Sequence, residues 1–132
     1  MSRGTPHFLL SAETSFSAAH RLPGVDMCDR IHGHDWRVRL TVRVTASDLG
    51  SNGMAVDFRD IERTVRAAVE DFEHRDLNQL ETFAHAAPTA EHVARIVSER
   101  AEAQLARVAP AVRVDEVEVW ETPTFRVVYR PS

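Results

Sequence analysis

The chain has 132 residues, of which 43% are hydrophobic and 27% charged, and this length and composition predict one folded globular domain over residues 1–132. Its net charge of −4 and isoelectric point near 5.9 do not give the basic surplus that nucleic-acid-binding domains carry. Arginine supplies all 16 basic residues, so the absence of lysine excludes an enzyme–lysine Schiff base and a Walker A phosphate loop.

The cysteine content and the apolar runs indicate where the protein works. Cys28 is the single cysteine, which excludes an internal disulfide and a multi-cysteine zinc finger and fits a reducing cytoplasm. No stretch approaches the ~20 apolar residues that a membrane-spanning helix needs. Met1 to Leu10 has one arginine and too short an apolar run for a signal peptide. We therefore expect a cytoplasmic protein that binds neither membranes nor nucleic acid.

Two strands are predicted in the first third of the chain. Residues 8–20 are mostly short, apolar and β-tolerant, which is typical of a long strand. Pro23-Gly24 then predicts a break, and residues 23–31 a loop. From Trp36 to Val44, apolar residues alternate with arginines and a threonine. This period of two predicts a second strand with one apolar and one arginine-rich face.

Two helices and two more strands are predicted in the rest of the chain. Asp57 is placed to cap a helix whose apolar spacing continues to an end near His74. Pro88-Thr89 predicts the start of a second helix, and strands are predicted over 112–121 and 125–129. This order predicts an α+β fold: a four-stranded antiparallel sheet with two helices inserted between strands 2 and 3. The open edges of so small a sheet favour oligomerisation.

A cluster of histidines suggests a metal site. His32 and His34 are two residues apart, so in an extended segment both imidazoles point the same way. His20 ends the first predicted strand, and a hairpin between the first two strands places it opposite that pair. Three neutral histidines suit Zn²⁺ and leave a coordination position free, which is typical of a catalytic site. The alternative is that these are surface histidines of a loop.

Three further features, a cysteine, a Glu-His pair and a glutamate, are candidates for chemistry. Cys28 precedes His32 by four residues and is either a fourth zinc ligand, a nearby thiolate acting as base or nucleophile, or an inert buried thiol. Glu73-His74 is either an acid–base pair or a solvated helix end. Glu121 continues an apolar strand face, where a carboxylate needs a partner such as the N–H edge of a heterocycle, unless it reaches water.

These motifs together resemble the 6-pyruvoyl tetrahydropterin synthase family over nearly the whole chain. The matching segments, in order, are Phe16-Ser17-Ala18-Ala19-His20-Arg21-Leu22, Cys28-Asp29-Arg30-Ile31-His32-Gly33-His34, Val56-Asp57-Phe58, Glu73-His74 with Leu77-Asn78, Pro88-Thr89-Ala90-Glu91 and Glu121-Thr122. The short spacing C-x-x-x-H-G-H is similar to the family's bacterial 6-carboxytetrahydropterin synthases. The pyruvoyl-forming animal enzymes typically have a longer spacing.

The resemblance implies a fold, an assembly and a reaction. The fold would be the tunnelling fold, in which subunits join their sheets into a barrel and two trimers stack into a homohexamer. The reaction would be the zinc-dependent conversion of 7,8-dihydroneopterin triphosphate to 6-carboxy-5,6,7,8-tetrahydropterin, acetaldehyde and triphosphate. It would belong to 7-deazaguanine synthesis, leading to queuosine or to a deazapurine metabolite. Arginines are the cations available for the triphosphate, and their planar forks suit it.

The resemblance also implies residue roles. His20, His32 and His34 match the zinc ligands, and Cys28 matches the catalytic thiol. His74 matches the catalytic histidine, and Glu121 the glutamate tied to pterin binding and the proton relay. The catalytic set is therefore Cys28, His74 and Glu121.

One residue departs from the pattern, and two other functions stay open. The family usually has aspartate where this chain has Glu73, which keeps the charge but adds a methylene, so Glu73 is left out of the catalytic set. One alternative is a 6-pyruvoyl tetrahydropterin synthase, or a side-chain-cleaving relative, with the same site and substrate. The other is a non-catalytic zinc-binding oligomeric scaffold, in which Cys28 closes the site as a fourth ligand.

Overall fold

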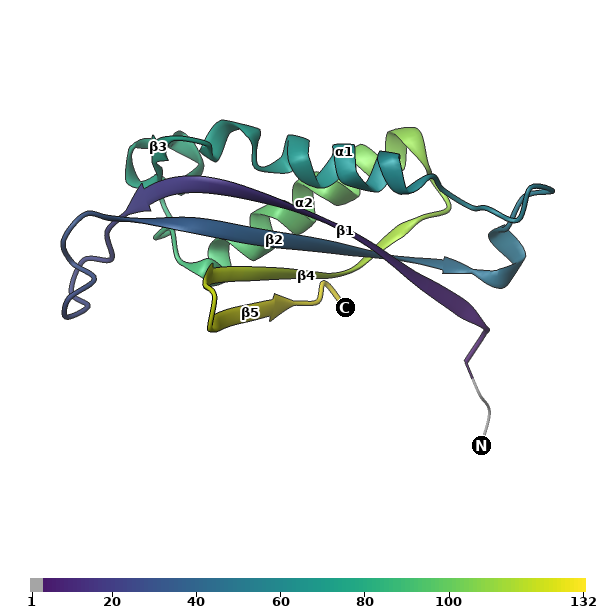
Figure 1. Ribbon diagram of the computed structural model, residues 1–132, viewed down its shortest axis with the longest axis horizontal. Helices are drawn as coiled ribbons and strands as arrows, with labels where there is room; N and C mark the ends of the chain where they lie inside the picture. Colours follow the sequence, from purple (N-terminus) through teal and green to yellow (C-terminus); the bar gives the residue numbers. More distant parts are fainter. Residues whose placement is uncertain (1–3) are drawn as a thin grey trace.

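The computed structural model describes residues 4–132. Residues 1–3, which belong to the predicted domain and to the segment from Met1 to Leu10 considered above, lie outside the described residues. One sheet, with the strand order β3-β1-β2-β4-β5, is covered on one face by two helices (Figure 1). The elements are β1 (His7–His20), β2 (His32–Thr45), α1 (Phe58–Ala68), β3 (Arg75–Asp76), α2 (Ala90–Val108), β4 (Arg113–Thr122) and β5 (Phe125–Tyr129), with short 3-10 turns between them. The predicted α+β class is confirmed, and the predicted elements occur in the expected order with one additional strand between the two helices. No helix in the described range is both long and apolar enough to cross a membrane.

The β1–β2 hairpin is the frame of the sheet. Its two strands pair without interruption from His7 opposite Thr45 to His20 opposite His32. The alternation in β2 predicted its buried face correctly, since Trp36, Val38, Leu40, Val42 and Val44 are all at most 2% exposed. The predicted start of this strand at Trp36 is wrong. It begins at His32, so the H-x-H pair lies within the strand, where the pairing with β1 extends it.

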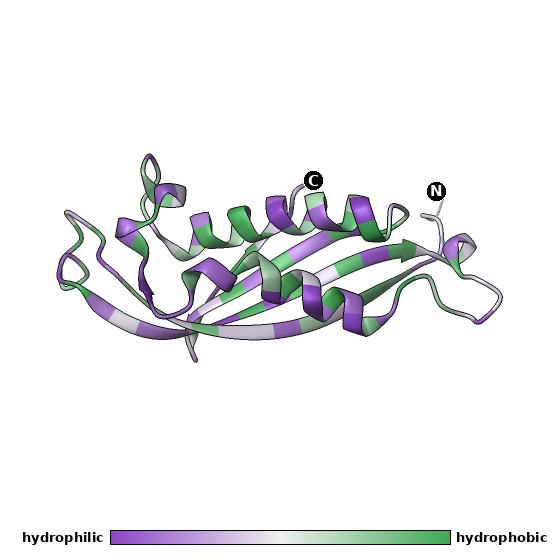
Figure 2. Cartoon of the chain, turned by 90° about the horizontal axis from the view of Figure 1, so that it is seen from above, coloured by the Kyte–Doolittle hydropathy of each residue, from purple (hydrophilic) through white to green (hydrophobic). Residues whose placement is uncertain are grey.

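The opposite face of the sheet is polar. Along the strands hydrophobic and hydrophilic residues alternate beneath the helices (Figure 2). On the polar face Arg37 lies 4.0 Å above the Trp120 ring, and Arg39 and Arg126 form ion pairs with the nearly buried Glu118. The predicted arginine-rich face therefore carries its own counter-charges.

The sheet has five strands rather than the predicted four. The additional strand, β3, has two residues and runs parallel to β1, pairing with Ala18 and Ala19. Two residues carry no period that distinguishes a strand from a loop, so the sequence did not indicate it. Its effect is to hold the segment after Glu73-His74 against the end of β1.

The first helix is shorter than predicted. Asp57 caps it as expected, with its carboxylate accepting from the Arg59 amide at 2.8 Å. The helix ends at Ala68 rather than near His74, and a 3-10 turn over 70–72 follows. The prediction failed because the apolar spacing continues into that turn, where Phe72 is fully buried.

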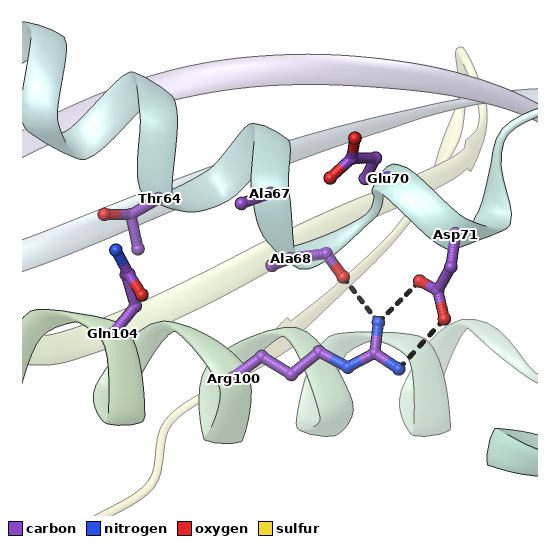
Figure 3. A pocket seen from close by; sticks show the side chains of 7 residues that line it. All are labelled: Thr64, Ala67, Ala68, Glu70, Asp71, Arg100 and Gln104. Carbon is purple, nitrogen blue, oxygen red and sulfur yellow. Dashed lines mark hydrogen bonds and ion pairs between the residues drawn. The ribbon is translucent and has the colours of Figure 1, made fainter.

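Arg100 on α2 holds the end of this helix (Figure 3). Its guanidinium donates to the Ala68 carbonyl at 2.8 Å and to both Asp71 oxygens at 2.7 and 3.2 Å. It also lies 5.0 Å above the Phe72 ring. A charged donor thus satisfies a carbonyl at the helix end, and α1 and α2 are joined across the pocket that the figure draws.

Thr89 is the N-terminal cap of α2, and its substitution tests what this cap contributes to stability. Its hydroxyl caps the helix by accepting from the His92 amide at 3.2 Å. We expect Thr89→Ala to lower the free energy of unfolding by about 1 kcal/mol, because a helix N–H loses its partner. Urea denaturation measures this, with Thr89→Ser, which keeps the hydroxyl, as the control. Equal loss in both variants would contradict a capping role.

Candidate metal centre and its surroundings

The three predicted histidines meet at the end of the sheet where β1 ends and β2 begins, on the left in Figure 1. His20 lies directly opposite His32 across the hairpin, and His34 is two residues further along β2, on the same face. One nitrogen from each ring lies within 4.8 Å of those of the other two. The alternative of separate surface histidines is therefore wrong. His20 is fully buried, and the other two are partly buried.

Backbone carbonyls orient two of the rings. His20 Nδ1 lies 2.8 Å from the Pro88 carbonyl oxygen, and His32 Nδ1 lies 2.7 Å from that of Arg30. A carbonyl only accepts, so each Nδ1 carries a proton, and in the neutral form of the ring this leaves the lone pair on Nε2. Among residues 4–132, the Nε2 atoms of His20 and His34 are buried without a hydrogen-bond partner. Three converging imidazoles, two of them with a buried and unpartnered ring nitrogen, fit a zinc ion with one position left open.

Glu121 reaches the same cluster from β4. Its Oε1 lies 3.2 Å from His20 Nε2 and 3.8 Å from His34 Nε2. The register between β4 and β5 shifts between Trp120 and Thr122, so Glu121 is the extra residue of a bulge. Bulges of this kind re-aim a side chain near a site. The expectation that this carboxylate has a partner stays a prediction, because the two ring nitrogens that it approaches within the described residues are themselves without a hydrogen-bond partner.

Burial and charge act in opposite directions on His34. Removal from water lowers the pKa of His34 below its ordinary value. The Glu121 carboxylate opposes this shift, while His20 and His32 add to it. The net lowering keeps His34 neutral at pH 7, which is the form that binds a metal.

Cys28 lies outside the histidine cluster. It is partly buried and lies in the loop between β1 and β2. Among residues 4–132, the side chains close enough together to share a metal ion are the three histidines, and Cys28 is not one of them. The geometry within one chain thus does not make Cys28 a fourth ligand.

His74 also lies apart from the cluster in this chain. It has a left-handed backbone conformation (φ 57°), and its side chain is 81% exposed. Its Nε2 is 3.0 Å from Glu73 Oε1, and the same carboxylate oxygen accepts from the Ser17 amide at 3.3 Å. His74 and His34 line one open pocket beside the β1–β3 edge. Glu73 is therefore in contact with His74 despite its longer side chain.

Sequence reasoning missed the groups that hold the site in place. The carbonyls of Pro88 and Arg30 carry no side-chain signal, although Pro88 was singled out as the start of a helix. Asn78 was noted within a motif but without a role. Its side chain bonds the backbone of Arg21, the residue after His20.

Comparison with known proteins agrees with this geometry. Residues 9–132 match the model of the family described as 6-pyruvoyl tetrahydropterin synthase. The chain is 40% identical over 96 residues to the putative 6-carboxy-5,6,7,8-tetrahydropterin synthase of Archaeoglobus fulgidus, covering 71% of this chain and 76% of that protein. It is 32% identical over 131 residues to the 6-carboxy-5,6,7,8-tetrahydropterin synthase of Bacillus subtilis, covering 95% and 86%.

A solved structure has the same fold. The 6-pyruvoyl tetrahydropterin synthase of Caenorhabditis elegans superposes with a TM-score of 0.81 over the full length of both chains, at 24% identity. This likeness establishes the architecture, and the sheet with two helices described above is that of the tunnelling fold predicted from the motifs.

Zinc titration tests the cluster. We expect one Zn²⁺ per chain and a loss of affinity of more than about 100-fold in His34→Ala, because removing a ligand costs more than removing a residue that only orients one. Isothermal titration and metal analysis measure this. His85→Ala, which removes an exposed histidine elsewhere, is the control. Unchanged binding in His34→Ala would refute the assignment.

The lowered pKa of His34 predicts how the zinc-free protein responds to acid. Unfolded His34 takes up a proton near the ordinary value of 6.5, whereas the folded protein takes it up only at lower pH. The unfolded state then binds more protons in this window, so stability falls as pH drops from 7 to 5. As pH drops from 7 to 5, the urea midpoint of unfolding should fall less steeply in His34→Gln than in His85→Gln. Equal slopes would contradict the effect.

Proposed function

The chain belongs to the 6-pyruvoyl tetrahydropterin synthase family, and from this premise we propose that it is a 6-carboxy-5,6,7,8-tetrahydropterin synthase. This lyase converts 7,8-dihydroneopterin triphosphate to 6-carboxy-5,6,7,8-tetrahydropterin, acetaldehyde and triphosphate. The two relatives at 32% and 40% identity carry that name. The observation that carries the proposal is the convergence of three histidine rings beside Glu121.

His20, His32 and His34 hold the metal in this proposal. When bound, zinc supplies Lewis-acid polarisation of the hydroxyl oxygens of the substrate side chain, which makes the adjacent C–H protons easier to remove. The carbonyls of Pro88 and Arg30 keep two of the rings in the tautomer that presents Nε2. The site is therefore oriented before metal and substrate arrive.

Glu121 holds the pterin in this proposal. Its carboxylate accepts two charge-assisted hydrogen bonds from an amino-pyrimidine edge. Because Glu121 is close to His20 Nε2, a pterin on this carboxylate lies with its side chain beside the metal site. The same carboxylate is placed to take part in a proton relay.

Cys28 is the proposed base for the C–H proton, and His74 the proposed acid or relay. Glu73 orients His74 through the 3.0 Å contact between its Oε1 and His74 Nε2. His74 is exposed in the single chain, which leaves its ring open to substrate or to a neighbouring subunit.

We propose a homohexamer made of two stacked trimers. Two observations support an assembly. β3 pairs with only two residues of β1, which leaves most of that edge free, and β5 forms the other edge. Open edges of this kind are covered in stable proteins. The proposed setting is the cytoplasm, in 7-deazapurine synthesis leading to queuosine or a related metabolite.

The scaffold alternative requires a closed site. Cys28 is outside the group of ligating atoms in the described chain, so a fourth protein ligand from this thiol is not supported. The 6-pyruvoyl alternative shares the zinc site and the substrate, and the product separates it from the proposed function.

A product assay decides between these functions. Zinc-loaded protein is incubated with 7,8-dihydroneopterin triphosphate, and the products are read by mass spectrometry. We expect the 6-carboxy product with acetaldehyde, and a loss of turnover of about 100-fold or more in Cys28→Ala with zinc retained, because the base is removed.

Other outcomes of this assay contradict parts of the proposal. A pyruvoyl product would move the protein to the sister activity. Loss of zinc together with unfolding in Cys28→Ala would favour the structural site. His85→Ala serves as the control for preparation and loading.

A further inference from the structure

The loop that carries Cys28 has little apolar anchoring. Residues 21–31 join β1 to β2 and extend beyond the end of the sheet (Figure 1). Val25, Met27 and Ile31, three large apolar side chains of this loop, are exposed. A loop without buried side chains takes its shape from hydrogen bonds, so the position of the Cys28 thiol depends on them.

Asn78 holds the base of this loop. Its Oδ1 accepts from the Arg21 amide at 2.8 Å, and its Nδ2 donates to the Arg21 carbonyl at 3.0 Å. The side chain thus pairs with the backbone of Arg21 as a neighbouring strand would. Within the described chain, these two are the only hydrogen bonds that join residues 21–31 to a segment outside the β1–β2 hairpin.

Asn78 itself is fixed on both sides. Its backbone N–H donates to the Asp76 carboxylate at 3.1 Å, and Asp76 belongs to β3, which pairs with β1. The preceding residue, Leu77, is fully buried in the core. Asn78 therefore has a position fixed by the core, and its hydrogen bonds to Arg21 hold the base of the loop at that position.

Arg21 carries the constraint on to the residues around Cys28. Its Nε donates to the Asp29 carbonyl at 3.1 Å, and its Nη2 to the Asp29 carboxylate at 3.1 Å. Next to it, the Leu22 amide donates to the Cys28 carbonyl at 2.7 Å. The backbone on either side of the Cys28–Asp29 peptide is thus bonded to residues that directly follow His20.

We propose that Asn78 and Arg21 are positioning residues that fix the Cys28 thiol relative to the three-histidine site. The proposal rests on the proposed function for the catalytic meaning of Cys28. Arg21, Asp29 and Asn78 lie within the sequence motifs, and none of them is used by the metal site or the proton transfers. A thiol displaced by about 1 Å from its working position costs about 100-fold in rate.

The proposed role separates local order from global stability. The Arg21 and Asp29 side chains are about half exposed, at 49% and 55%, and an exposed ion pair contributes little to the folded state. Breaking it should loosen the loop and leave the fold and the metal site intact. A merely structural role would instead lower the unfolding midpoint.

The experiment compares Asn78→Ala and Arg21→Ala with two matched controls. Asn52→Ala removes an asparagine that accepts from a backbone amide in a different exposed turn, and Arg95→Ala removes an exposed arginine paired with Glu99 on α2. The first readouts need no substrate: the rate at which iodoacetamide alkylates Cys28, the single cysteine, and hydrogen exchange at the Leu22 amide.

In Asn78→Ala and Arg21→Ala we expect several-fold faster alkylation and faster exchange, with zinc content and urea midpoint equal to those of the controls. In turnover we expect kcat to fall about 10- to 100-fold with KM nearly unchanged. Arg21→Lys, which keeps the charge but not the fork, should recover part of the loss.

Three outcomes would overturn the proposal. Alkylation and exchange equal to those of the controls would mean that the loop is held elsewhere, for example by a neighbouring subunit. A lowered urea midpoint or lost zinc in both Asn78→Ala and Arg21→Ala would mean a role in folding. Unchanged kcat in an active enzyme with a loosened loop would separate the loop from the chemistry. If the wild-type protein forms no product, the proposed function fails. The substrate-free readouts still decide whether Asn78 and Arg21 fix the loop that carries Cys28.

Discussion

The pairing of His20 with His32 across the β1–β2 hairpin is the constraint on which the site depends. The two strands are paired over their whole length, and a shift of one residue would turn each side chain to the opposite face. Such a shift would move the histidines of β2 to the polar face and expose Trp36, which is fully buried. The packing of the core therefore also fixes where the three histidines lie, and the position of His34 follows from the period of the strand.

The groups around the histidines determine what the cluster is able to do. Pro88 and Arg30 offer neutral carbonyls to two rings, so these rings are oriented without a second charge. Glu121 brings the carboxylate, and it does so from a bulge at the end of β4. A cluster of imidazoles with one adjacent carboxylate suits a divalent cation and a polar heterocycle. The buried Nε2 atoms of His20 and His34 have no hydrogen-bond partner among the described residues.

The site combines two kinds of support. The three histidines lie on strands whose positions the core determines, whereas Cys28 lies on a loop held by polar contacts from Asn78 and Arg21. Rigid elements position groups more reproducibly than loops do. In the proposed function, the Cys28 thiol reaches substrate and still allows product release, and a segment whose order is separable from that of the core permits both. This division explains why few large side chains of the loop are buried.

The sequence by itself determined the features that depend on short spacing. Alternation predicted the buried face of β2, and the H-x-H spacing with His20 at a strand end predicted that the three histidines meet, because a strand has a fixed period of two. Asp57 and Thr89 predicted both helix starts, since a cap acts within one turn.

Only the tertiary structure decided the rest. The end of α1 at Ala68 depends on Arg100, 32 residues away, and β3 exists because β1 offers it a free edge. The contact of Glu121 with His20, and the hydrogen bond between the Asn78 side chain and the Arg21 backbone, join segments far apart in the chain. Such contacts form where the packed elements bring particular atoms together, several of them backbone atoms that every residue shares, so no local pattern of side chains encodes them.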